Sequence, residues 1–364
     1  MRVLCLSNMY PGRDDPDYGA FVATMCEALE RAGAEVELAA IDVRGGGVLR
    51  TPAKYAGLTR RALPRARAAD VVYVHYLFPT GAVARLCRAV GGAPFVVTAH
   101  GRDVRNLARP GVRRGTAAAL STAAGVIAVS RYLAGQLRAS GLELPPVHVA
   151  NMGVDLRRFL PQDRAAARAR LRIAPRGPLV LAAGGLTDRK NPLTLLQAFA
   201  RLRVRVPAAR LAFVGDGPLA AAVDAGTERL GLAGHVIRTG ALPHDEVGDW
   251  MAASDALALV SRVEPLGVVA LEAMASGRPV VATRVGGAAE VVPDGRGGAI
   301  VDPDDPDDIA SGLGAVLSDP PSAAACRRIA EAHGVDRQAR RILGVLAGAA
   351  GRPEELDARA GEPR

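Results

Sequence analysis

Short runs of apolar, mostly β-branched residues recur along this chain, separated by longer Ala-, Leu- and Arg-rich stretches. Apolar runs that alternate with helical stretches, such as Phe21–Ala32 and Ser130–Ser140, are typical of parallel strands covered by helices on both faces. In the first part of the chain we expect strands at Val3–Leu6, Val36–Ala40, Val71–Val74, Phe95–Thr98, Val126–Val129 and Val147–Val149. In the second part we expect them at Leu179–Ala183, Arg210–Val214, Val236–Arg238, Ala256–Leu259, Pro279–Ala282 and Ala299–Val301.

The strand pattern starts again after residues 151–155, and this restart predicts two domains. We expect an N-terminal domain over residues 1–152 and a C-terminal domain over residues 153–322, each a Rossmann-like doubly wound sheet. The helical stretch from about 323 to 350 is expected to pack back onto the N-terminal domain, and residues 351–364 to form a disordered tail. The ligand is then expected at the carboxyl ends of the strands, in a deep cleft between the two domains.

The composition narrows the class of protein. Hydrophobic residues make up 49% of the chain, which suits a globular protein, and no apolar run reaches the roughly 18 residues that span a bilayer. The first apolar run is too short for a signal peptide. The four cysteines, Cys5, Cys26, Cys87 and Cys326, are scattered without metal-ligand spacing. We therefore expect a reduced, cytoplasmic protein.

The net charge of +9 is concentrated in residues 1–150, which carry 19 Lys and Arg against 11 Asp and Glu. Two basic runs stand out, Arg44–Arg67 and Arg102–Arg114. Such a face attracts anionic lipid headgroups, nucleic acid or a phosphorylated substrate, although it could also be only a solvated surface. Nucleic acid is disfavoured because the basic runs lack interleaved aromatics and no recognition motif is present. Peripheral attachment to the inner face of the plasma membrane stays open.

Two carboxylates eight residues apart, Glu264 and Glu272, bracket the most informative stretch of the chain. Pro265 suits a first helical position, and the following amides, with the positive end of the helix dipole, form a site for phosphate. At 1.5 Å per residue the two acids lie about 12 Å apart along a helix. The pair could therefore grip opposite ends of an elongated, hydroxyl-rich anion such as a nucleotide sugar. A helix-start acid and a solvated acid are the structural alternative.

The block from Glu264 to Glu290 resembles the EPxGxxxxEAMAxGxPVVAT and GGxxE pattern of retaining glycosyltransferases of family 4, which have the GT-B fold. Shorter segments match this family in the same order, at residues 98–103, 151–155, 184–191 and 215–218. The opening residues 7–22 resemble the branch that builds teichuronic-acid-type and other cell-surface polysaccharides. The resemblance covers nearly the whole chain and implies a hexosyltransferase, whose N-terminal domain would bind the acceptor and whose C-terminal domain would bind the nucleotide-sugar donor.

The resemblance implies a role for each matching residue of the donor site. Glu272 would bind the ribose hydroxyls and Glu264 the hydroxyls of the transferred sugar. Lys190 would neutralise the diphosphate as its charge grows. The arginine that many relatives have five residues before this lysine is Gly185 here, so Arg189 would supply the second cation. The backbone from Leu266 through Gly267 and Val268 to Val269 would contact the sugar or diphosphate.

Three further residues have counterparts in the family. His100 matches a histidine that contacts the transferred sugar and assists catalysis. Gly19 matches a glycine whose bare backbone approaches the diphosphate and acceptor. Arg238 lies near the nucleobase region. A surface lysine at 190, a satisfied loop histidine at 100 and a packing arginine at 238 are the structural alternatives.

The implied reaction moves a sugar from a UDP- or GDP-sugar to a hydroxyl of a glycan, lipid-linked or small-molecule acceptor, with retention of configuration. No metal or other cofactor is expected, because Lys190 and the helix amides do the work of a cation. The acidic run Asp302–Asp308 is expected to cap a helix rather than bind metal. A nucleotide-sugar epimerase and a non-catalytic sugar-nucleotide-binding subunit are the alternatives.

Overall fold

The computed structural model describes residues 1–13, 18–43, 47–174 and 176–352. Most of the tail expected over 351–364 therefore lies outside the described residues. The chain divides into two compact units. The first is Met1–Gly153 together with the chain from Val335 on, and the second is Val154–Gly334.

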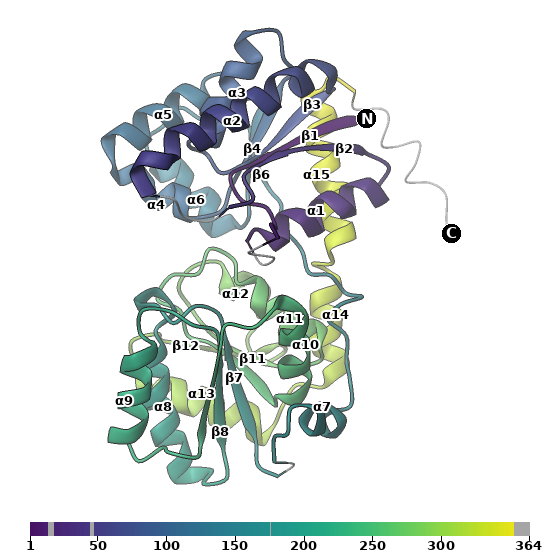
Figure 1. The fold of residues 1–364 in the computed structure, drawn as a ribbon. Helices are drawn as coiled ribbons and strands as arrows, with labels where there is room; N and C mark the ends of the chain where they lie inside the picture. Colours follow the sequence, from purple (N-terminus) through teal and green to yellow (C-terminus); the bar gives the residue numbers. More distant parts are fainter. Residues whose placement is uncertain (14–17, 44–46, 175, 353–364) are drawn as a thin grey trace. The chain divides into compact units, whose positions relative to one another are not determined.

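The first unit is built on a six-stranded parallel sheet in the order β2-β1-β3-β4-β5-β6 (Figure 1). Its strands are β1 (Arg2–Ser7), β2 (Glu35–Ala40), β3 (Val71–His75), β4 (Phe95–Ala99), β5 (Gly125–Ala128) and β6 (Val147–Val149). Every residue of β3, β4 and β5 is buried, as expected for central strands with helices on both faces. Its helices are α1 (Ala20–Arg31), α2 (Gly47–Ala68), α3 (Thr80–Ala89), α4 (Arg102–Arg105), α5 (Pro110–Leu120), α6 (Arg131–Ala139) and α15 (Val335–Ala349).

The second unit has its own six-stranded parallel sheet, in the order β12-β11-β10-β7-β8-β9. Its strands are β7 (Leu179–Ala183), β8 (Arg210–Val214), β9 (Val236–Gly240), β10 (Ala256–Leu259), β11 (Val280–Thr283) and β12 (Gly298–Val301). Its helices are α7 (Arg164–Arg170), α8 (Pro192–Arg205), α9 (Ala220–Arg229), α10 (His244–Ala253), α11 (Val268–Ala275), α12 (Ala288–Val291), α13 (Pro306–Ser318) and α14 (Ala323–Glu331). All the expected strands are present, so the prediction of two Rossmann-like α/β units is confirmed.

Each sheet reverses its strand order at one point, and these points fix where a ligand is expected. In the first unit the reversal falls between β1 and β3, and in the second between β7 and β10. Loops that follow the carboxyl ends of such strands diverge and leave a crevice. Around the second sheet, large apolar side chains such as Phe199 and Phe213 are fully buried. Each contributes about 1.5–3 kcal/mol relative to exposure, so the strand ends rest on a packed core.

The stretch expected as a C-terminal helix over 323–350 is two helices that belong to different units. Helix α14 packs against α11 in the second unit, whereas α15 packs against α1, β3 and β4 in the first. The interruption lies at His333 and Gly334, where the Val154 amide donates to the His333 carbonyl at 3.1 Å and Val154 pairs with Gly334. A backbone committed to that bridge cannot continue the helix, so only the part from Val335 on packs onto the first unit.

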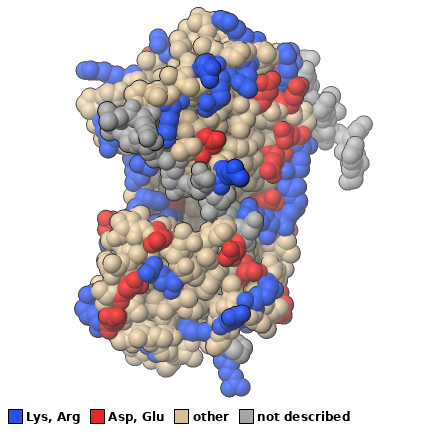
Figure 2. Space-filling view, in the orientation of Figure 1, with Lys and Arg blue, Asp and Glu red and all other residues tan. Residues whose placement is uncertain are grey.

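Basic side chains of the first unit gather on α2, which carries much of the first expected basic run. Arg60, Arg61 and Arg67 are exposed, while Arg65 lies 3.5 Å from Glu37. Figure 2 shows Lys and Arg side chains spread over this face of the unit, with acidic side chains grouped toward its right-hand side. Among the helices of the described residues, none combines the length and the apolar character that a bilayer crossing requires.

Candidate functional site

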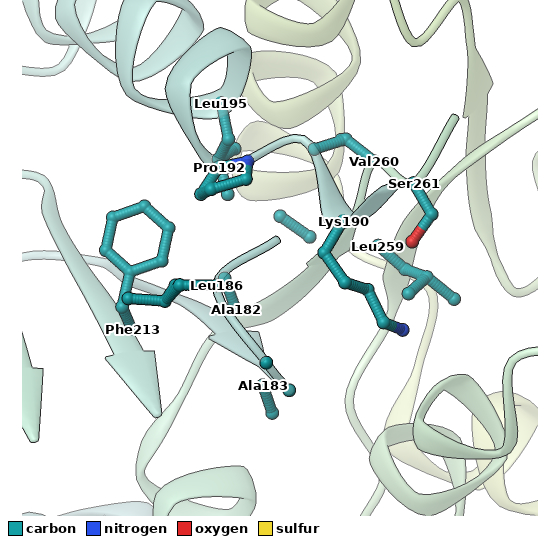
Figure 3. A pocket seen from close by; sticks show the side chains of 13 residues that line it. Ala182, Ala183, Leu186, Lys190, Pro192, Leu195, Phe213, Leu259, Val260 and Ser261 are labelled. Carbon is teal, nitrogen blue, oxygen red and sulfur yellow. The ribbon is translucent and has the colours of Figure 1, made fainter. Parts of the chain in front are cut away.

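A pocket opens in the second unit where its sheet reverses, between β7 and β10. It is lined by the end of β7 and its following loop, by Lys190, and by the end of β10 with Ser261. Figure 3 shows Lys190 and Ser261 on one side of the pocket and Phe213 and Leu186 on the other. The lining is therefore mostly apolar with two polar side chains on one side, a mixture that suits a ligand with both characters.

The pocket's lysine is paired with Glu264, one of the two expected glutamates. Lys190 Nζ donates to Glu264 Oε2 at 2.6 Å, and Ser261 Oγ donates to the same oxygen at 3.1 Å. Glu264 is only 7% exposed, so its charge depends on these partners. The pair joins the loop after β7 to the loop after β10, on the two sides of the reversal.

The ionisation of Glu264 results from two opposing effects. Burial alone would raise the pKa of this carboxyl, but Lys190, Arg189 and Ser261 together hold the pKa below its ordinary value. The site therefore keeps a carboxylate ionised in a nearly dry position, which is costly unless cations compensate it. An ionised, buried acceptor is suited to hydrogen bonds from hydroxyl groups.

Arg189 also reaches Glu264, and Gly185 leaves room beside them. Arg189 Nη1 lies 3.4 Å from Glu264 Oε2 and donates to the Val263 carbonyl at 3.1 Å. A Cβ added at Gly185 would meet nothing closer than 3.5 Å. The loop therefore provides two cations, Lys190 and Arg189, and its backbone at Gly185 has room for a Cβ.

Helix α11 begins later than the sequence suggests. Its first residue is Val268, and Gly267 precedes it with φ 87°, so the interpretation of Pro265 as the first helical residue is wrong. A left-handed residue at 267 stops the helix from starting earlier, because helical residues need negative φ. Glu272, 9% exposed, is consequently one turn beyond Val268 on the same face of the helix, not two turns from its start.

The glycine loops after β7 and β8 pack backbone against backbone. The Gly184 amide donates to the Val214 carbonyl at 2.9 Å, and the Leu186 amide donates to the Asp216 carbonyl at 3.0 Å. A Cβ on Gly215 would lie 2.1 Å from the Gly184 carbonyl oxygen. These close approaches require glycine and hold the floor of the pocket in place.

Arg238 is outside this group. It lies in β9 and forms a two-pronged ion pair with Asp224 of α9, with both N···O distances at 2.8 Å. It is not among the residues that line the pocket.

The acidic run after β12 serves to cap a helix, because Asp305 caps α13 by accepting from the amides of Asp307 and Asp308. The capping prediction is confirmed, and in the described part of the chain no group of metal-ligand residues was found.

His100 lies at the carboxyl end of β4 in the first unit. The buried carboxylate of Asp103 accepts from the amides of His100, Gly101, Val104 and Leu77 at 2.8–3.3 Å, and so fixes the loop that carries it. The rings of Phe21 and Tyr76 flank it, with centroids at 5.1 and 4.9 Å. Burial lowers the pKa of His100 to about 3, so the ring is neutral at pH 7.

Gly19 precedes α1 with φ 79°. A Cβ at this position would lie 2.7 Å from the carbonyl group of Met9. The glycine is therefore required by the approach of its own loop to the end of β1, whether or not a ligand also uses it.

Two residues that the sequence interpretation passed over belong to these sites. Ser261 donates to Glu264, and its own carbonyl accepts from Thr283 Oγ1 at 2.7 Å. His75 ends β3, and its Nδ1 lies 3.1 Å from Nε2 of His100. A signal for both was available, since each follows or ends an apolar run that was expected to be a strand, at the edge where ligands bind.

The comparisons with known proteins agree with this geometry. Residues 163–333 match the family described as "Glycosyl transferases group 1", and residues 19–158 match "Glycosyltransferase Family 4". One relative is the GDP-mannose-dependent alpha-(1-6)-phosphatidylinositol monomannoside mannosyltransferase of Mycolicibacterium smegmatis, 38% identical over 70% of this chain and 69% of its own length. Another is the D-inositol 3-phosphate glycosyltransferase of Xylanimonas cellulosilytica, 32% identical over 95% of this chain and 96% of its own.

Solved structures show the same fold. The crystal structure of Anabaena HepE in complex with UDP and glucose superimposes with a TM-score of 0.79, at 22% identity, over 96% of this chain and 100% of that one. Sucrose-phosphate synthase from Thermosynechococcus elongatus gives a TM-score of 0.74 at 21% identity, over 99% of each chain. The two sheets thus define the GT-B class. This chain belongs to the family 4, group 1 glycosyltransferases, and it is a glycosyltransferase of the GT-B type.

Proposed function

We propose that this glycosyltransferase moves a sugar from a nucleoside-diphosphate donor to a hydroxyl acceptor, with retention at the anomeric carbon. The bond between the anomeric carbon and the diphosphate breaks, and the acceptor oxygen bonds to the same face of the sugar. The acceptor proton passes to the departing phosphate oxygen. Lys190 and Arg189 stabilise the charge that grows on the diphosphate, and the amides of Leu266–Val269 add the field of the helix start.

The observation that carries this proposal is the buried carboxylate of Glu264 between two cations, where the sheet of the second unit reverses its strand order. Glu264 is available to accept from hydroxyls of the transferred sugar, while Glu272, one turn into α11, is assigned the ribose hydroxyls. When a diphosphate arrives, Lys190 has a second anion within its reach. The ion pair with Glu264 therefore holds the Lys190 ammonium in position for the diphosphate, in addition to bridging the two loops.

The donor can be identified by binding. HepE was crystallised with UDP and with UDP-glucose, and the name of the mycobacterial relative specifies GDP-mannose. A panel of UDP- and GDP-sugars should therefore be tested by thermal stabilisation, where a ligand at 100 times its Kd adds about 2.7 kcal/mol. Turnover should then be measured with Glu272→Gln and Lys190→Met. Wild-type turnover in both variants would refute the site assignment. Release of free nucleotide only when an acceptor is present supports a transferase, whereas conversion of the nucleotide sugar into its epimer without an acceptor would favour an epimerase.

We further propose that transfer needs no metal, since Lys190, Arg189 and the α11 amides supply positive charge. Unchanged turnover after dialysis against EDTA is the expected result. A complete loss that Mg²⁺ or Mn²⁺ restores would overturn this part of the proposal.

We propose a lipid-linked or glycan acceptor at the inner membrane face, in the assembly of a cell-surface polysaccharide or glycoconjugate. The support is the exposed basic surface of α2, because each Lys or Arg near an anionic membrane contributes about 1 kcal/mol. Co-sedimentation with vesicles should rise with phosphatidylglycerol content and fall with salt. Arg60→Gln with Arg67→Gln should weaken it, and Arg205→Gln with Arg229→Gln, exposed in the second unit, should not. Equal losses in both double variants would refute this attachment.

A further inference from the structure

Two histidines meet edge to edge in the first unit. His75 ends β3, and His100 follows the neighbouring strand β4. Nδ1 of His75 lies 3.1 Å from Nε2 of His100, and the ring planes differ by only 19°. The ring centroids are 5.3 Å apart, farther than the two nitrogens, so the ring edges face one another. One of the two nitrogens must carry the hydrogen of this bond.

The two rings have unequal surroundings. His75 is completely buried, with the Tyr73 ring at 4.5 Å, and its Nε2 is a buried atom without a hydrogen-bond partner in the described part of the chain. His100 is only partly buried. Its Nε2 is occupied by His75, so Nδ1 is the nitrogen left for an outside group.

This asymmetry decides where the hydrogens sit. A neutral imidazole carries one N–H. If that of His75 were on Nε2, a buried N–H would have no acceptor, which is rarer in proteins than an under-satisfied acceptor. The hydrogen is therefore on Nδ1 of His75, which donates to Nε2 of His100. His100 then carries its own hydrogen on Nδ1.

We propose that His75 is a positioning residue that fixes His100 as its Nδ1–H tautomer, so that His100 presents a neutral hydrogen-bond donor to the substrate. The consequence for turnover rests on the proposed function, in which His100 contacts the sugar being transferred. The tautomer itself does not depend on that function. A ring nitrogen's protonation is commonly set by the bond that the other nitrogen makes.

Two amide substitutions separate positioning from simple packing. His75→Asn puts its amide nitrogen where Nδ1 stands and can still donate to His100, whereas His75→Gln reaches the position of Nε2 instead. We expect the Asn variant to keep most of kcat. The Gln variant should lose about 10–100-fold, the range found when residues that orient metal-bound histidines are replaced. The KM for the donor should change little in either variant.

The tautomer can be read directly, without any turnover. In protein labelled with ¹⁵N-histidine, long-range ¹H–¹⁵N spectra at pH 7 distinguish the two neutral tautomers, and His100→Asn assigns the signal. We expect Nδ1–H for His100 in the wild type and in His75→Asn, with Nε2–H gaining in His75→Gln. A wild-type His100 in the Nε2–H form, or one form unchanged in every variant, would overturn the proposal.

The two readouts also separate this proposal from the proposed function. If the tautomer changes in His75→Gln while kcat is retained, His75 does fix the tautomer, and the link from this tautomer to turnover is refuted while the transferase reaction stands. If no nucleotide sugar is turned over by the wild type, the proposed function fails, and the spectra still decide the tautomer. Circular dichroism of each variant verifies that the protein is folded, and the wild-type tautomer is read on the unsubstituted protein once His100→Asn has assigned its signal.

Discussion

Replacing Lys190 by Met should leave the buried carboxylate of Glu264 without its ammonium partner and so destabilise the second unit. Glu264 is 7% exposed and would keep only Ser261 at 3.1 Å and Arg189 at 3.4 Å. Removing one partner of a fully buried ion pair costs about 3–5 kcal/mol. Because Lys190 is 18% exposed and two donors remain, we expect a loss of about 2 kcal/mol.

One side chain can report the loss in the free energy of unfolding that Lys190→Met causes. Trp250 is its single tryptophan and lies 7% exposed in α10 of the second unit. Its fluorescence during urea unfolding reports on the unit that contains Lys190 and Glu264, whatever the first unit does. Glu264→Gln and the double variant complete a double-mutant cycle, in which we expect a coupling of about 1–2 kcal/mol. Arg262→Met, which breaks an exposed pair with Asp304 at 2.9 Å, is the matched control and should cost below about 1 kcal/mol.

The pH dependence gives the same reasoning a second test. In the wild type the pKa of Glu264 is held below its ordinary value. The ionised carboxylate therefore stabilises the folded state at neutral pH, and this stabilisation is lost as the pH falls through that pKa. Without Lys190, burial raises the pKa, and the ionised carboxylate becomes a cost. The deficit of Lys190→Met should therefore be largest at pH 7 and narrow toward about pH 4. Additivity of the two substitutions within about 0.5 kcal/mol, or a deficit independent of pH, would refute the argument.

Three further predictions follow from the same geometry. Gly286→Ala should lower the free energy of unfolding, followed by Trp250 fluorescence, by about 1–3 kcal/mol, because φ is 88° and the new Cβ would overlap the Glu264 carbonyl oxygen. Gly185→Ala should change the same free energy by less than about 0.5 kcal/mol. Equal losses in the two variants would contradict this prediction. Burial lowers the pKa of His75 and His100. The free energy of unfolding should therefore be unaffected by these rings above about pH 6.5, and should fall below that pH by up to about 1.4 kcal/mol per pH unit for each ring. Urea unfolding followed by circular dichroism should show that the free energy of unfolding of His100→Asn depends less on pH than that of the wild type. Gly185→Arg should fit and tighten UDP binding about tenfold, the equivalent of about 1.4 kcal/mol; calorimetry giving unchanged affinity would mean that Arg189 already suffices.

The fold could be predicted because its signal is local. A strand such as Val71–His75 is buried on both faces, so its apolar run is visible in the sequence without any knowledge of its neighbours. The start of α11 was missed for the opposite reason. Pro265 is compatible with a first helical position, but the left-handed φ of Gly267 decides the boundary, and glycine tolerates either sign of φ. The break before α15 likewise depends on the pairing of Gly334 with Val154, a contact between distant parts of the chain.

The site residues differ in how far their position along the chain reveals them. Lys190 and Ser261 follow the carboxyl ends of strands and line the pocket at the sheet reversal of the second unit. His75 and His100 stand at the carboxyl ends of strands in the first unit. Arg238 is instead the middle residue of β9, where the outward side chain is available to the covering helix, and Asp224 of α9 takes it. Position relative to the strand end thus separates residues at the edge of the sheet where ligands commonly bind from one that holds a helix to its sheet. The same criterion applied to the sequence would have added His75 to the candidates and ranked Arg238 below them.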